Sequence, residues 1–212
     1  LPPAQTSLLP QQGTPRATPP PPRPRKMLAR LAAALGAIVV VALSAAPADA
    51  DCPKPKPSLI CVLAPTAGNS VHGTITVSPA RHRDGTKGVL INANITGLLP
   101  PRTVHGWHVH EFGDVSADNG KATGGHYNPK GVVHGLPGGT VRHQGDIGNL
   151  PASDDAGSVV VQGHWVPKLR AKKVLGRALI IHALTDDGGQ PTGNAGARLA
   201  QCVLGVAGPA KD

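Results

Sequence analysis

Aromatic residues are scarce in this chain of 212 residues, which has two tryptophans, one tyrosine and one phenylalanine. A protein that binds nucleic acid through its bases needs aromatic rings among its basic residues, because the rings stack on the bases. The formal net charge of +9 is therefore no sign of a nucleic-acid partner. Without residues 1–50, 16 basic and 11 acidic residues remain, a net charge of +5, which favours a small anionic substrate.

No apolar run in the chain reaches the ~20 residues that a membrane-spanning helix requires. The longest candidate, residues 31–43, follows Met27 and Arg30 and precedes the small-residue sequence Ala48-Asp49-Ala50. A basic start, a short apolar run and a small-residue end are the parts of a cleaved secretory signal. Residues 27–50 are thus predicted to be a signal peptide cut near Ala50, which predicts an extracytoplasmic protein without stable membrane insertion.

The segment before that signal has a different composition. Residues 1–26 contain nine prolines and no paired apolar pattern, which is typical of a disordered leader, or of sequence that is not translated. The folded domain is expected in residues 51–212.

Little helical periodicity is present from residue 58 onward. Short apolar runs are broken by Gly, Pro, Asn and Asp, which is typical of an all-β fold. The predicted strands are residues 59–64, 71–78, 88–97, 103–110, 157–162, 177–183 and 199–206. The stretch 111–156 has no strand pattern and is predicted to be a long functional loop.

Histidines dominate the candidate chemistry, and the three cysteines lie outside their cluster. His108 and His110 stand two apart at the end of an apolar run, so both side chains face the same side of a strand. Imidazoles and one carboxylate suit copper, zinc, nickel or iron rather than a thiolate-bound cluster. The remaining candidate ligands are His126, His134, His143, Asp146 and His182.

These seven side chains divide into two sets. Three histidines and one aspartate suit a closed tetrahedral zinc site, and four histidines suit Cu(II) with an open position. Seven residues can fill both sets only if one histidine uses both ring nitrogens, and His126 is the natural bridge. His72, His82 and His164 are predicted to be ordinary structural or surface residues, and His105 to pack behind the ligands.

Four motifs resemble the copper/zinc superoxide dismutases. They are residues 105–114 (HGWHVHEFGD), 125–129 (GHYNP), 143–149 (HQGDIGN) and 192–199 (TGNAGARL), and the resemblance spans about residues 58–207. It implies an eight-stranded Greek-key β-barrel or sandwich with long metal-binding and electrostatic loops.

The resemblance also implies the role of each site residue. Copper would lie on His108, His110, His126 and His182, and zinc on His126, His134, His143 and Asp146. Asp186 would hydrogen-bond one ligand of each metal.

The implied activity is the disproportionation of superoxide to oxygen and hydrogen peroxide by a copper that cycles between two oxidation states. His126 would join copper to a structural zinc and take up a proton. Arg198 would attract and orient the anion beside the open copper position.

The chain departs from the family in two places. The segment from His182 to Arg198 is shorter than in animal cytosolic members and lacks part of the charged steering region. The usual disulfide joins the first long loop to the position three after the arginine, which is Gln201 here. Cys202 is displaced by one and faces the other side of its strand, so its partner would be Cys61 or Cys52. The altered loop anchor leaves the family's homodimer open.

Two functional hypotheses remain. The first is an active dismutase. The second is a protein on the same fold that binds or delivers copper without turnover, since a fold does not decide function. The residues Arg198, His126 and Asp186 favour the enzyme.

The basic cluster of residues 168–173 is predicted to be a solvated loop face rather than a patch for acidic surfaces.

Overall fold

The computed structural model describes residues 57–209, and the predicted leader and signal peptide lie outside these residues. The elements are β1 (Leu59–Pro65), β2 (His72–Arg81), β3 (Lys87–Thr96), β4 (Gly106–Val109), η1 (Lys121–Thr123), β5 (Asp146–Asn149), β6 (Val159–Pro167), α1 (Ala171–Val174), β7 (Ala178–His182), β8 (Arg198–Val203) and β9 (Gly205–Val206). No helix in this described part is long and apolar enough to cross a membrane.

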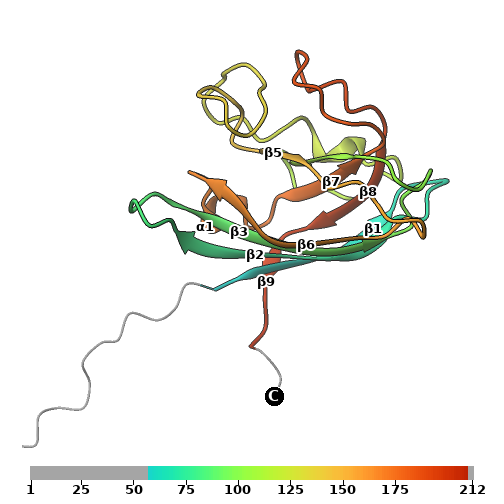
Figure 1. Cartoon of the computed structure of the whole chain (residues 1–212), viewed down its shortest axis with the longest axis horizontal. Helices are drawn as coiled ribbons and strands as arrows, with labels where there is room; N and C mark the ends of the chain where they lie inside the picture. Colours follow the sequence, from blue (N-terminus) through green and yellow to red (C-terminus); the bar gives the residue numbers. More distant parts are fainter. Residues whose placement is uncertain (1–56, 210–212) are drawn as a thin grey trace, which may run out of the picture. The chain divides into compact units, whose positions relative to one another are not determined.

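The strands form a nearly closed antiparallel barrel. Hydrogen bonds connect them in the order β5-β4-β7-β8-β1-β2-β3-β6, with β9 added beside β1, and Figure 1 shows β5, β7 and β8 in a layer above β2, β3 and β6. A contact between a side chain and the backbone connects the two end strands: a ring nitrogen of His164 on β6 lies 2.8 Å from the backbone carbonyl oxygen of Ile147 on β5. The all-β, Greek-key prediction is confirmed.

Alternation of side chains builds the core. Leu59, Cys61 and Leu63 on β1 are buried, while β7, which is covered on both sides, is buried along its whole length. Trp107 is fully buried. Strand β1 therefore places alternate side chains inside the barrel, as the sequence pattern predicts.

Strand β5 corrects the prediction that residues 111–156 form no strand. It has four residues, starts with the charged Asp146 and contains Gly148, so it carries no apolar alternation. Its partner β4 induces it through pairing such as His108 with Asp146. Tertiary pairing has overridden the local sequence pattern here.

Two other strand boundaries differ from the predicted ones, again because pairing between strands decides where a strand ends. The ladder between β2 and β3 runs from His72–Thr96 to Arg81–Lys87, which extends the second strand three residues past the predicted end. The last predicted strand, residues 199–206, is divided at Leu204 into β8 and β9.

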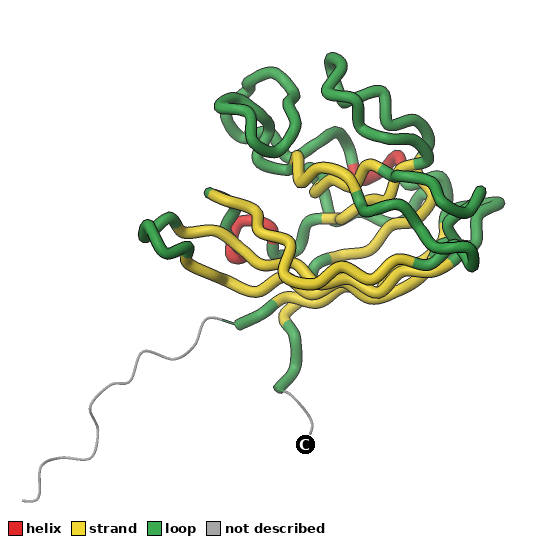
Figure 2. Tube along the Cα trace, in the orientation of Figure 1, coloured by secondary structure: helices red, strands yellow, loops and turns green. Residues whose placement is uncertain are grey.

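Two long loops rise from the same side of the barrel (Figure 2). We call residues 110–145 the first loop and residues 183–197 the second loop. Gln190 of the second loop donates a hydrogen bond of 2.9 Å to the carbonyl of His134 and accepts one of 3.1 Å from its N–H. The loops are thus joined where the predicted ligands lie.

A disulfide joins Cys61 on β1 to Cys202 on β8, with 5.5 Å between the Cα atoms. Cys61 is therefore the partner of Cys202 among the two alternatives. The bond closes a segment with a sequence separation of 141, and the chain-entropy model assigns such a loop about 5 kcal/mol of stabilisation.

We expect Cys202→Ala to lower the free energy of unfolding by about 2–5 kcal/mol, because it removes this restraint on the unfolded chain. Urea denaturation of the full chain measures the loss. Cys52→Ser is the control, since it removes the third cysteine and leaves the bridge intact. Equal stability of the two variants would contradict the structural role of the bond.

Candidate metal centre

Strand pairing brings the predicted ligands together. His108 on β4 lies between Asp146 on β5 and Ile180 on β7 in the sheet. His110, just past β4, forms an isolated bridge with His126 of the first loop. His182 ends β7. The ladder register therefore sets the spacing of the ligands, which come from strands and loops distant in sequence.

The first group of side chains consists of four buried histidines whose ring nitrogens lie within 4.8 Å of one another: His108, His110, His126 and His182. The rings of His108 and His126 stack with centroids 3.9 Å apart. The Nε2 atoms of His110 and His182 are 3.4 Å apart. Four convergent imidazole nitrogens are a donor set that suits copper.

The second group contains His126, His134, His143 and Asp146, all buried and within the same limit. Asp146 is its centre: one carboxylate oxygen lies 2.8 Å from Nδ1 of His126 and 3.1 Å from Nδ1 of His143, and the other lies 2.9 Å from Nδ1 of His134. Three imidazoles and a carboxylate are a donor set for tetrahedral zinc. His126 belongs to both groups.

Two buried nitrogens show that these groups are suited to metal ions. Nδ1 of His108 has no hydrogen-bond partner within the described residues, and Nδ1 of His134 lies 2.9 Å from a carboxylate oxygen of Asp146 without forming a hydrogen bond. Buried polar atoms are almost always paired, so such atoms inside a cluster of imidazoles are suited to a ligand. The residues present therefore fit one metal ion in each group.

Asp186 holds the opposite nitrogen of both these rings. Its carboxylate oxygens lie 2.8 Å from Nε2 of His108 and 3.0 Å from Nε2 of His134. With Nε2 donating to Asp186, each ring keeps its Nδ1 lone pair for a metal. One carboxylate thus orients one member of each group.

The backbone around Asp186 is itself fixed. The side chain of Asn149 accepts a 2.8 Å hydrogen bond from the Asp186 N–H and donates one of 2.9 Å to its carbonyl. Gly193 lies so close that a Cβ atom there would be 2.8 Å from Nε2 of His134, and its φ is +78°. Only glycine meets both demands at that position.

Burial is the largest influence on the titration of the histidines. It lowers the pKa of His108 to about 4 and that of His182 to about 3, and it holds the pKa of His110 well below the usual value. Burial opposes ionisation of the carboxylates too, but the hydrogen bonds from His108 and His134 hold the pKa of Asp186 at about 2. Neutral imidazoles beside ionised carboxylates are the protonation states that metal ions require.

Arg198 approaches this cluster from β8. Its guanidinium donates to the carbonyls of Gly120 and Gly124, the latter at 2.7 Å, and to Oγ1 of Thr123 at 3.0 Å. It is half-buried, and burial lowers its pKa from the usual value. A cavity of about 310 Å³ is lined by Arg198 and Lys121, with no acidic residue in its wall. A cavity with this lining suits a small anion.

Gln201 anchors the loop that holds Arg198. Only 6% of the surface of Gln201 is exposed. Its side-chain amide donates hydrogen bonds to the carbonyls of Val115 at 3.3 Å and Ala117 at 2.9 Å. The loop then continues to Gly120, which accepts from Arg198. Gln201 and Cys202 are neighbours on β8, and their side chains serve the loop and the barrel respectively.

The structure brings all seven predicted ligands, Asp186 and Arg198 into one neighbourhood. His105 is buried beside them: its Nδ1 lies 2.9 Å from the carbonyl of His182, and its Nε2 lies 2.7 Å from Oγ1 of Thr103. The sequence analysis did not assign roles to Asn149, Thr123 or Gln201. Asn149 lies in a quoted motif, and Gln201 stands at the position where the family's disulfide meets the first long loop, so each of these two had a signal in the sequence.

Comparison with protein families matches most of the described residues. Residues 71–204 match the family model described as copper/zinc superoxide dismutase (SODC). The match covers both groups of candidate ligands, Asp186 and Arg198.

We expect the metal-free chain to lose about 4 kcal/mol of stability between pH 8 and pH 5. Unfolded histidines take up protons near pH 6.5, whereas folded His108 and His182 remain neutral until about pH 4 and 3, so acid favours the unfolded state. The buried carboxylates are ionised in both states over this range. Urea denaturation at the two pH values measures the change.

The metal-loaded chain is the control for this experiment. Bound ions hold the imidazoles neutral, so its stability should change less over the same range. Equal stability of the metal-free chain at both pH values would contradict the burial argument.

We expect Gln201→Leu to speed hydrogen exchange in residues 115–120 and to lower the free energy of unfolding by about 1 kcal/mol. Leucine has a similar volume but no donor for the two carbonyls. Hydrogen-exchange mass spectrometry reads out the loop, with Gln162→Leu, an exposed position on β6, as the matched control. Unchanged exchange in that loop would show that Gln201 is not its anchor.

Proposed function

Because the chain belongs to the copper/zinc superoxide dismutase family, we propose that it is an active enzyme that disproportionates superoxide. One superoxide loses an electron and leaves as oxygen. A second superoxide gains that electron and two protons and leaves as hydrogen peroxide. The family binds copper and zinc, and the sharing of His126 by two four-residue ligand groups is the observation that carries the proposal.

We assign copper to His108, His110, His126 and His182, and zinc to His126, His134, His143 and Asp146. When bound, copper would supply the one-electron redox chemistry and zinc a fixed positive charge. His126 can serve both ions only through its two ring nitrogens. Its Nδ1 lies beside Asp146 at 2.8 Å, which supports Nε2 as the nitrogen for the copper side.

The protein residues would then hold the ligands and manage the anion. Asp186 keeps the rings of His108 and His134 in one tautomer by accepting from both Nε2 atoms. The Arg198 cation attracts superoxide and orients it, and its backbone acceptors in the first loop fix its position. His126 is the residue suited to hold a proton at Nε2 for delivery to the reduced product.

Lys121 adds a second cation to the cavity that Arg198 lines. The second loop is short, so these two residues would provide much of the attraction for the substrate. Charge lining a cleft raises the association rate of an oppositely charged substrate and makes it sensitive to salt. Lys121 is thus proposed as a steering residue that the sequence analysis did not single out.

The decisive experiment is to load the purified chain with copper and zinc, count the bound ions by mass spectrometry, and follow superoxide consumption by pulse radiolysis. One copper, one zinc and fast consumption per chain support the proposal. Two bound ions without consumption would instead support the alternative of a copper-binding or copper-delivery protein.

We expect Arg198→Ala to lower the second-order rate constant for superoxide by about tenfold, because the anion loses its guide, with metal content unchanged. Lys121→Gln should lower it less, and both variants should be less sensitive to salt. Lys130→Gln, an exposed change elsewhere in the first loop, is the control. Loss of copper from Arg198→Ala would show that its role is structural instead.

We also propose that the chain is exported and cut near Ala50, and that it acts outside the cytoplasm. The disulfide between Cys61 and Cys202 supports this, because such bonds persist in oxidising compartments. Mass spectrometry of the exported chain checks the cleavage site, and a mature form that retains Met27 would contradict it. A homodimer remains compatible with the family.

A further inference from the structure

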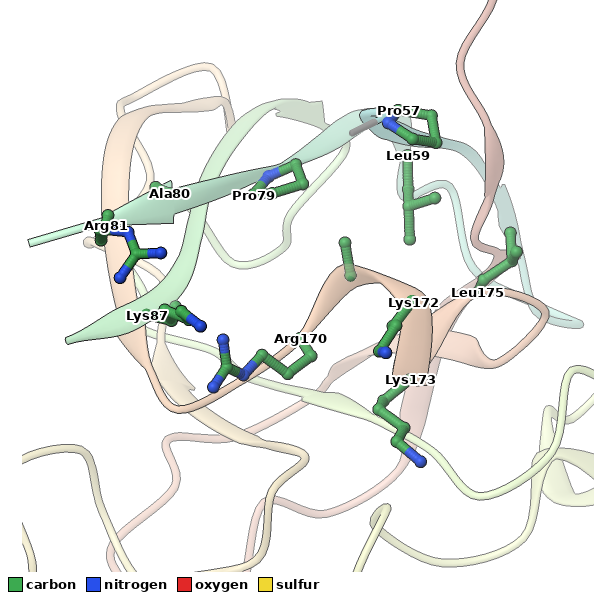
Figure 3. A pocket seen from close by; sticks show the side chains of 12 residues that line it. Pro57, Leu59, Pro79, Ala80, Arg81, Lys87, Arg170, Lys172, Lys173 and Leu175 are labelled. Atoms are coloured by element: carbon green, nitrogen blue, oxygen red, sulfur yellow. The ribbon is translucent and has the colours of Figure 1, made fainter. Parts of the chain in front are cut away.

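A second cavity lies apart from the metal centre and shares no residue with it. It has a volume of about 880 Å³ and is lined by the end of the β2–β3 hairpin, by α1 and by the start of β1. Figure 3 shows the side chains around it. We call it the basic pocket. Its volume is in the range of pockets that hold small organic ligands.

Five cations line the basic pocket, and no acidic residue does: Arg81, Lys87, Arg170, Lys172 and Lys173. None of them forms an ion pair within residues 57–209. The sequence analysis interpreted residues 168–173 as a solvated loop face, but folding adds the hairpin cations to the same cavity. Like charges gathered in this way repel each other, and a bound anion would relieve that repulsion.

The other part of the wall is apolar. Leu59, Pro79, Ala171 and Leu175 line it, and Figure 3 shows Leu59 pointing into the space opposite Arg170. Leu175 is 46% exposed, so apolar surface is available at the opening. A cavity with an apolar side and a cationic side matches a ligand that has an apolar body and an anionic head.

The lining excludes one competing partner. No aromatic residue lines the basic pocket, and proteins that bind single-stranded nucleic acid stack its bases on aromatic rings. A nucleic-acid strand would therefore find charge here but no stacking surface.

We propose that the basic pocket binds an amphiphilic organic anion, such as an alkyl carboxylate or sulfonate. The head contacts the cations of the hairpin and of residues 170–173, and the apolar body lies against Pro79 and Leu175. The site works independently of the metal centre, so this inference does not rest on dismutase activity.

The experiment titrates the full chain with decanoate, decanol and acetate, below the concentration at which decanoate forms micelles. Isothermal titration calorimetry follows the binding. We expect decanoate to bind with a stoichiometry of one, and decanol and acetate to bind about tenfold more weakly or not at all, because each lacks one half of the complementary chemistry. Decanoate binding should weaken at high salt.

Two variants locate the site. Arg170→Gln with Lys172→Gln should weaken decanoate about tenfold, and Leu175→Gln should weaken it several-fold without making acetate bind. Arg83→Gln, an exposed cation on the same hairpin that does not line the pocket, is the matched control and should bind as the parent chain does. Superoxide consumption should be unchanged in all three.

Three outcomes would overturn the proposal. They are no saturable binding of decanoate, equal weakening by Arg83→Gln, and equal affinity for decanol. A further titration uses vesicles of phosphatidylglycerol. Binding of the chain to the vesicles, with no binding of free decanoate, would show a membrane-surface site instead of a pocket for a free ligand.

Discussion

The carboxylate of Asp186 is the interaction on which the arrangement of the two ligand groups depends. Each of its oxygens accepts a hydrogen bond from Nε2 of one histidine, His108 in the first group and His134 in the second. Both rings thereby present Nδ1 to their ligand group: that of His108 has no hydrogen-bond partner in the described chain, and that of His134 lies 2.9 Å from the Asp146 carboxylate. If Asp186 moved, both groups would lose the tautomer and orientation of one ligand together.

Strand β8 connects the centre to the rest of the barrel through three of its six residues. Arg198 reaches the first loop at Gly120 and Gly124, Gln201 binds that loop upstream, and Cys202 is bonded to β1. The loop anchor and the covalent bond are thus separate in this chain, on opposite faces of one strand. The hydrogen bonds of Gln201 place the loop, while the disulfide acts on the stability of the barrel.

Most of the fold class and the ligand set followed from local pattern. Period-two alternation marked the long strands, and the pair His108 and His110 showed two ligands on one side of a strand. The short strand Asp146–Asn149 could not be predicted in this way, because its residues serve the metal centre and carry no apolar alternation. Its existence depends on pairing with β4, which is a property of the folded chain.

The basic pocket also combines a feature that the sequence shows with one that only the folded chain shows. Residues 168–173 alone resembled a solvated cationic loop, and only the packing of α1 near the β2–β3 hairpin added Arg81 and Lys87 to one cavity with an apolar wall. The sequence by itself determined which side chains could bind metal and that the strands alternate, since residue type and spacing are local properties. Tertiary structure decided the tautomers set by Asp186, the anchor at Gln201, the partner of Cys202 and the basic pocket, because each requires atoms far apart in the chain to meet.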